Sequence, residues 1–278
     1  EESGSGGSNR ESALKALRAK VGCIRTARAN DGRSFSSGCE AVDDWLPAGG
    51  LHPSTLTEWI AASDSAAAGT MSMLAAASRL RQIPDRPLVV VDSEGSFYPP
   101  AAAGLGVSPR RMILLRPRSG RDTVWAIDQA LRSGAVAAVW ASLPMRLDER
   151  DARRFQLAAE TGRTPGLFVR DFHARGKPSF SEVQFYVADQ KRLRRSQGAS
   201  SRVSVRNDFE TISVTLERVR GGMVGRHLEL QIDASANVRP FPSSGTKRHE
   251  TAAEHLAARL ANPTIAKRVA ARRSRNAS

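Results

Sequence analysis

The sequence predicts an α/β protein with a mostly parallel central sheet, flanking helices and an antiparallel C-terminal hairpin. The first indication is the valine-rich run from Leu88 to Asp92, which is typical of a parallel strand buried on both faces. The second is the alternation of such runs with helical segments, which favours parallel strands joined by helical crossovers. The third is the change after residue 180 to strands around Gly221 and Gly222, which predicts a hairpin.

The predicted elements follow from apolar periodicity and from turn residues, taken in chain order. Strands are expected over 54–60, 88–92, 112–115, 136–140 and 166–169, and antiparallel strands over 183–187, 211–219 and 227–232. Helices are expected over 12–28, 70–82, 123–132 and 148–161, with a helix or turn at 101–105 and helical periodicity over 251–272. In the helix 123–132, the residues available for burial are Trp125, Ile127, Ala130 and Leu131.

The chain divides into a core and two flanking parts. Residues 1–11 are predicted to be disordered, 12–33 to carry a helix, 34–233 to form the core, and 234–278 to form a linker and a basic, partly helical tail. Apolar residues at helical spacing mark two candidate docking surfaces for a partner: Leu14, Leu17, Val21 and Ile24 in the first helix, and Leu256 and Leu260 in the tail. For the first helix, packing on the chain's own core is an equally good interpretation.

Composition narrows the classes of function. The formal net charge of +14 favours a polyanionic partner, and nucleic acid is the first candidate. The two cysteines, Cys23 and Cys39, form no disulfide framework or metal motif, so we expect a reducing, cytoplasmic location and no metal site. No apolar run approaches the roughly 20 residues that a membrane helix needs.

A loop of small residues lies where a nucleotide-binding protein would carry its phosphate loop. Such a loop normally supplies a Lys to the outer phosphates and a hydroxyl to Mg²⁺. Here it contains Ala61, Ser63, Ser65, Ala67, Gly69 and Thr70, and no Lys occurs between Lys20 and Lys177. The strand 136–140 runs on to Ser142 without an acid, so the Mg²⁺-side carboxylate is missing as well. We therefore expect no nucleotide cofactor.

An acidic pair, Asp92 and Glu94, stands at the end of the 88–92 strand, at the sheet edge where ligands bind in α/β folds. Glu94 is in the place of a base that activates water, and we interpret it as vestigial. The alternative interpretation of both acids is a capped turn, which the sequence favours slightly.

Several segments resemble the RecA family over roughly residues 34–233. They are Phe35–Cys39, Gly49–Leu51 with Thr57–Glu58, Val90–Gly95 running on to Gly104–Val107, Gly134–Val136, and Val214–Arg218 with Gly221–Gly222. Within that family the chain looks most like ImuA, a RecA-related group of bacterial damage-inducible mutagenesis proteins. The segments that suggest this are Phe97–Ala102, Trp125–Arg132, Arg154–Glu160 and Ala174–Ser179.

The resemblance implies a RecA-like core and a set of altered site residues. It places the phosphate-loop Lys on Ala67, the following hydroxyl on Ala68, the adenine-stacking aromatic on Ala101 and the Mg²⁺-side Asp on Ser142, while Glu94 is kept. It also suggests a DNA-contacting segment between Val169 and Val183. Candidate DNA contacts are Arg170, Arg175 and Lys177 there, and Arg192, Arg194 and Arg195 in a basic insertion.

The function that the resemblance implies is that of a non-catalytic adaptor in error-prone translesion synthesis. Its partners would be an ImuB-like relative of Y-family polymerases and, through it, an error-prone replicative polymerase, with RecA and DNA as further candidates and no membrane. Two alternatives stay open: a weak DNA-dependent ATPase or recombination factor, and a cell-division inhibitor similar to SulA.

Overall fold

The computed structural model describes residues 34–63, 67–143, 147–177, 179–189, 209–233, 235 and 237–241. All of these belong to one compact unit that ends at Phe241. The predicted N-terminal helix, the basic insertion with Arg192, Arg194 and Arg195, and the tail with Leu256 and Leu260 lie outside the described residues, and so does Ser65.

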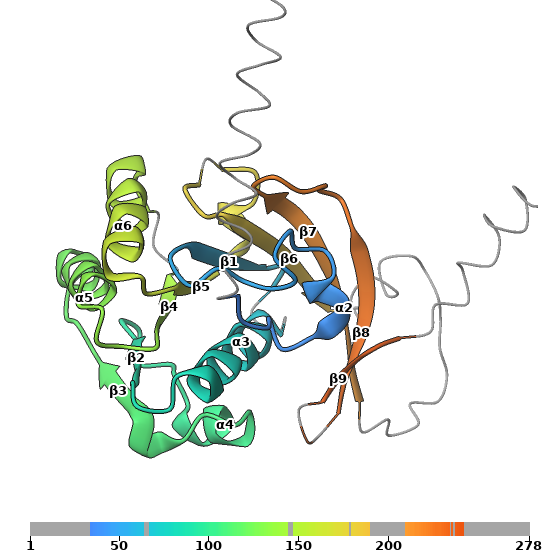
Figure 1. Cartoon of the computed structure of the whole chain (residues 1–278), viewed down its shortest axis with the longest axis horizontal. Helices are drawn as coiled ribbons and strands as arrows, with labels where there is room; N and C mark the ends of the chain where they lie inside the picture. The colour runs from blue at the N-terminus through green and yellow to red at the C-terminus, as the bar shows by residue number, and fades with distance from the viewer. Residues whose placement is uncertain are drawn as a thin grey trace, which may run out of the picture. The chain divides into compact units, whose positions relative to one another are not determined.

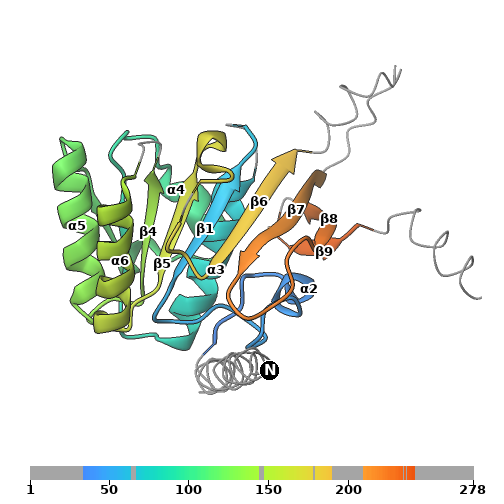
Figure 2. The same cartoon turned by 90° about the horizontal axis from the view of Figure 1, so that it is seen from above.

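Within the described residues the strands form one nine-stranded sheet in the order β3-β2-β4-β5-β1-β6-β7-β8-β9 (Figures 1 and 2). The strands are β1 Leu56–Ala61, β2 Leu88–Val91, β3 Met112–Leu115, β4 Ala138–Leu143, β5 Gly166–Arg170, β6 Val183–Asp189, β7 Phe209–Val219, β8 His227–Asp233 and β9 Val238–Pro240. The strand β1, the first in sequence among the described residues, therefore lies at the middle of the sheet.

The first six strands run parallel and the last three add antiparallel pairs, which confirms the predicted fold class. The strand β6 is where the direction changes, because it is parallel to β1 on one side and antiparallel to β7 on the other. The sequence pattern grouped this segment with the antiparallel strands. Between β5 and β6 the chain returns to the end of the sheet where the parallel strands begin, so β6 runs in the same direction as β1. Hydrophobic periodicity is a local property and does not indicate the direction in which a strand enters the sheet.

Helices cover both faces of the parallel part of the sheet (Figure 2). The helix α3 (Ala68–Gln82) packs on one face, against β1, β4, β5 and β6, and α2 (Glu40–Asp43) and α4 (Pro99–Gly104) are short. The opposite face carries α5 (Gly120–Arg132) and α6 (Glu149–Gly162), which pack against each other. Two short 3₁₀ turns, η1 (Pro109–Arg111) and η2 (Phe172–Ala174), complete the regular structure.

Each face of the sheet has its own apolar core. On the α3 side, Ala75, Ala76 and Ala77 are fully buried, and these small side chains let the helix lie close to the strands. On the α5–α6 side, Phe155 of α6 packs on Phe168 of β5 with ring centroids 5.7 Å apart. The polar ends of these helices are also specified locally, since α5 begins where Ser119 Oγ accepts a hydrogen bond from the Asp122 amide.

The position of Trp125 corrects the sequence analysis, which counted it among the buried residues of its helix. Its side chain is 60% exposed, whereas Val124, Ile127 and Leu131 are buried. These three recur at spacings of three and four residues, so they form the apolar stripe of the inward face of α5, which also buries Thr123, Ala126 and Asp128. Trp125 lies on the outward side of that stripe.

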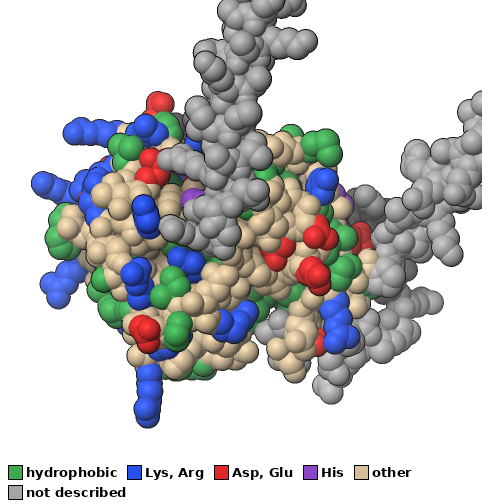
Figure 3. Space-filling view, viewed as in Figure 1, with side chains coloured by type: hydrophobic (Ala, Val, Ile, Leu, Met, Phe, Trp, Pro, Cys, Tyr) green, Lys and Arg blue, Asp and Glu red, His purple; other side chains and the backbone are tan. Residues whose placement is uncertain are grey.

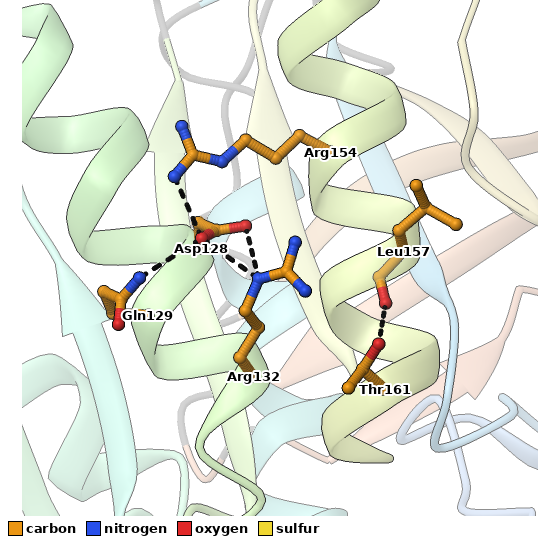
Figure 4. Close-up of polar contacts among 6 residues, drawn as sticks. All are labelled: Asp128, Gln129, Arg132, Arg154, Leu157 and Thr161. Atoms are coloured by element: carbon orange, nitrogen blue, oxygen red, sulfur yellow. Dashed lines mark hydrogen bonds and ion pairs between the residues drawn. The ribbon is translucent and has the colours of Figure 1, made fainter.

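A carboxylate joins the two helices of the outer layer (Figure 4). Asp128 of α5 is 2% exposed and accepts a hydrogen bond from Arg132 Nε at 3.1 Å and one from Arg154 Nη2 of α6 at 3.0 Å. Burial favours the neutral acid, but the hydrogen bonds and charges of Arg154 and Arg132 outweigh it, so the pKa of Asp128 is lowered. The two helices are therefore joined by an ionic contact as well as by apolar packing.

Replacing Asp128 by Asn is expected to lower the free energy of unfolding by about 1–2 kcal/mol at neutral pH, since charged hydrogen bonds are lost but both arginines stay partly hydrated. Because the folded state lowers the pKa of Asp128, its contribution is complete at neutral pH and is lost as the pH falls below about 4. Urea unfolding at neutral and acid pH measures the difference, with Asp85→Asn as an exposed control. A penalty that grew in acid would contradict this assignment.

Candidate functional site

The carboxyl ends of the parallel strands form the sheet edge where the sequence places a nucleotide site. The loop after β1 leads into α3, and the loop after β2 carries Asp92 and Glu94. Ser142 is the next-to-last residue of β4. The chain thus brings together the positions that the RecA resemblance selects. Their side chains are what determine whether phosphate chemistry is possible there.

The start of α3 carries two buried alanines where a phosphate loop would carry a lysine and a hydroxyl. Ala67, which the resemblance aligns with the phosphate-loop Lys, is 6% exposed, and Ala68 is fully buried. Ala67 is the N-cap residue and offers no side-chain cap, and the first turn contains no acid. Gly69 and Thr70 follow within the helix. Backbone amides are available at this end, but no cationic side chain accompanies them.

Asp92 serves the fold of its own loop. Its carboxylate accepts hydrogen bonds from the amides of Ser96 at 3.0 Å and Phe97 at 3.2 Å, and Arg116 Nε lies 3.5 Å from it. The side chain is 2% exposed, so the acid is used as a cap inside the turn. Glu94, by contrast, is exposed. The structure therefore supports the capped-turn interpretation for Asp92 and leaves Glu94 free to meet solvent.

Aromatic side chains occupy the space between α3 and the β2–β4 edge. Trp140 of β4 donates its indole N–H to Ser72 Oγ of α3 at 2.8 Å, and Phe97 packs on it with ring centroids 5.3 Å apart. Ser142 follows Trp140 by two residues and so faces the same side of the strand. The position of the missing Mg²⁺-side acid is thus next to an apolar, hydrogen-bonded indole. Sequence reasoning used Trp140 only as a strand residue.

A buried carboxylate, Glu58 in the middle of β1, was missed by the sequence analysis as a site residue. It is 4% exposed and lies among four polar partners, of which Ser181 is the most distant, with its Oγ at 3.5 Å. Arg170 Nη1 approaches at 3.2 Å, and Ser179 Oγ and Gln184 Nε2 donate at 2.9 and 2.8 Å. The sequence signals were an acid within a mostly apolar strand and the place of Thr57–Glu58 among the segments that resemble the RecA family. This cluster fastens the segment between β5 and β6 to the sheet.

That segment is the one predicted to contact DNA, and its cations differ in exposure. Arg170 is 11% exposed and paired with Glu58. Arg175 is 44% exposed, pairs with Glu217 at 2.7 Å and stacks 3.7 Å from the Tyr186 ring centroid. Lys177 is exposed, as is the neighbouring Phe172. Of the three cations predicted to contact DNA in this segment, Lys177 is therefore the one that can contact a phosphate without rearranging.

No group of three or more His, Cys, Asp or Glu in the described parts of the chain is arranged to hold a metal ion. Among the same residues, no helix combines the length and apolar character that crossing a bilayer requires.

Similarity to known proteins identifies the fold of this chain. No protein-family model matches the chain. Protein RecA of Chlorobium chlorochromatii (strain CaD3) is 29% identical over 133 residues, which are 46% of this chain and 37% of that protein. The chain thus matches little more than a third of the length of this curated relative. The crystal structure of the RadB recombinase matches with a TM-score of 0.51 and 16% identity, covering 73% of this chain and 97% of that one.

The core has a RecA-like fold. The antiparallel strands β6–β9 at the C-terminal side complete that match. The likeness to RadB, at this low identity, concerns the fold alone. Activity therefore has to be argued from the side chains of this chain.

Removing the Glu58 carboxylate is expected to destabilise the RecA-like core by about 3 kcal/mol, because Arg170 would stay buried without its partner. Glu58→Ala should also speed amide hydrogen exchange in residues 171–182, which the carboxylate fastens to β1. Chemical unfolding and exchange mass spectrometry measure both effects. Glu94→Ala, which removes an exposed carboxylate, is the matched control and should leave both unchanged; equal behaviour of the two variants would show that the cluster does not secure the segment.

Proposed function

We propose that this chain is a non-catalytic RecA-like adaptor in damage-induced mutagenesis, which supports error-prone translesion synthesis by binding an ImuB-like polymerase subunit. The observation that carries the non-catalytic part is the start of α3, where buried Ala67 and Ala68 stand in place of a phosphate-binding Lys and hydroxyl. Phosphoryl transfer depends on positioning and on charge stabilisation. A site without these groups retains little of either.

The partner class rests on sequence segments outside the nucleotide edge, chiefly Trp125–Arg132 and Arg154–Glu160, which resemble ImuA. Both segments lie in the α5–α6 layer. A RecA-like core that keeps its outer layer while losing its phosphate chemistry is what an adaptor derived from a recombinase would look like. The role in translesion synthesis, the polymerase partners and the link to RecA follow from that resemblance.

The alternative is a weak DNA-dependent ATPase, and one observation favours it. Glu94 is exposed at the carboxyl edge of the sheet, where a base could activate water. Against it stand the absence of any Lys in the loop, the use of Asp92 as a turn cap, and the presence of Ser142 in place of an Mg²⁺-binding acid.

Restoring the lysine is expected to leave ATP hydrolysis at background. In Ala67→Lys, the new side chain starts from a buried position, and both Ala101 and Ser142 remain unable to bind adenine or Mg²⁺. Phosphate release with Mg²⁺ and ATP, with and without single-stranded DNA, measures the effect. The same variant carrying Glu94→Gln sets the background, and clear turnover that this second change abolishes would show an otherwise intact active site.

The adaptor role is tested by a pull-down from DNA-damaged cells of the source organism, with the full chain and with a version that ends at residue 240 as baits. We expect mass spectrometry to identify a Y-family-like polymerase subunit with the full chain. Loss of that subunit with the shorter bait would place the contact in the tail, and undamaged cells are the control for induction. Recovery of no replication or repair protein by either bait would contradict the proposed role while leaving the fold unaffected.

A further inference from the structure

The outer face of α5 presents one line of side chains to solvent. Arg121 and Trp125 are four residues apart, and Arg132 follows seven residues after Trp125, so all three lie on the same side of the helix. Trp125 is 60% exposed, although the inward stripe of α5 already buries enough apolar surface to hold the helix on the sheet. The tryptophan therefore contributes little to the fold at this place.

An exposed tryptophan beside arginines is the composition of a protein-binding hot spot. Trp and Arg are among the residues that carry most binding energy at interfaces, and large apolar side chains at the surface mark such sites. On the neighbouring helix α6, Leu157 is a second exposed apolar side chain, 41% exposed. Figure 3 shows Lys and Arg side chains projecting on the side of the molecule where α5 and α6 lie, with hydrophobic side chains between them.

The charges around Trp125 are arranged so that positive groups face outward. Arg132 and Arg154 are each 41% exposed and share the single carboxylate of Asp128, which is 2% exposed and lies beneath them (Figure 4). Asp128 by itself offsets only one of these two positive charges. Asp122 accepts a hydrogen bond from Ser119 at the start of the helix. Asp151 acts on Arg154 from α6.

We propose that this surface, formed by Arg121, Trp125, Arg132 and Arg154, binds a protein segment in which carboxylates flank an apolar side chain. The apolar side chain would pack on Trp125, and the carboxylates would meet the outward guanidinium groups in charge-assisted hydrogen bonds. A phosphate backbone fits less well, because the exposed apolar side chains of Trp125 and Leu157 call for an aliphatic or aromatic side chain to pack on them. The surface lies in the α5–α6 layer, whose segments also carry the resemblance to ImuA, but its recognition of an acidic and apolar segment does not require the role in translesion synthesis.

The geometry is also prepared for binding before a partner arrives. Asp128 holds the guanidinium groups of Arg132 and Arg154 from below, so fewer rotamers have to be fixed on association. Trp125 itself has only two side-chain torsions to order. Because these side chains are already ordered, less conformational entropy is lost on binding, so a small exposed area can give specific recognition.

Short random peptides displayed on phage, selected on the immobilised full chain, provide the probe. We expect enriched peptides to combine Asp or Glu with aromatic or aliphatic residues. Their affinity should fall about tenfold or more with Trp125→Ala and clearly with Arg121→Glu. Tyr98→Ala, which removes an aromatic side chain that is 67% exposed elsewhere, is the matched control and should bind like the parent. Thermal unfolding of each variant checks that the fold is retained.

The outcomes that would overturn the inference are distinct. Enriched peptides that bind Trp125→Ala as well as the parent would show that this surface is not their binding site. Enrichment of basic peptides would contradict the expected preference for carboxylates. Binding of oligothymidylate that Trp125→Ala abolishes, without any peptide that depends on Trp125, would assign the surface to single-stranded nucleic acid instead. Because the pull-down bears on the polymerase partner and this selection bears on α5, either can fail without the other.

Discussion

A single buried carboxylate at the centre of the sheet constrains much of this core. Glu58 occupies a mid-strand position in β1, which hydrogen-bonds to β5 on one side and to β6 on the other. A charge in such a place is tolerated only when its oxygens are fully engaged. Arg170 at the end of β5, Gln184 in β6 and Ser179 between them supply those contacts. The path from the parallel to the antiparallel half of the sheet is therefore tied to one side chain.

The same sheet edge shows how a phosphate site differs from a packed one. In a nucleotide-binding core, the turn after the first strand and the end of a neighbouring strand keep polar groups free for the ligand. Here Asp92 is occupied by the amides of its own loop, and Trp140 is hydrogen-bonded to Ser72 across the space beside α3. The Asp92 carboxylate and the Trp140 indole N–H have therefore found partners within the protein. Such an edge gains structural stability and loses the unsatisfied groups that a ligand would need.

The sequence predicted the order and type of the main elements because hydrophobic periodicity and turn residues are local signals. The absence of a lysine from the loop after β1 can be read directly from the sequence. The sequence did not predict the roles of Glu58 or Asp128, because their partners Gln184 and Arg154 are 126 and 26 residues away along the chain. It misplaced Trp125, because one residue of phase in a helix decides between the core and the solvent, and a large apolar side chain fits either pattern.

The central position of β1 has a consequence for how the chain folds during synthesis. Arg170 and Gln184, which complete the surroundings of Glu58, follow it by 112 and 126 residues, and both neighbouring strands of β1 come equally late. Contacts this distant in sequence raise the contact order and slow folding. The strand β1 leaves the ribosome with both edges unpaired and stays so until β6 has been made. The half-made chain thus exposes a strand that is buried in the finished fold for a long interval, which is the condition in which nascent proteins depend on chaperones.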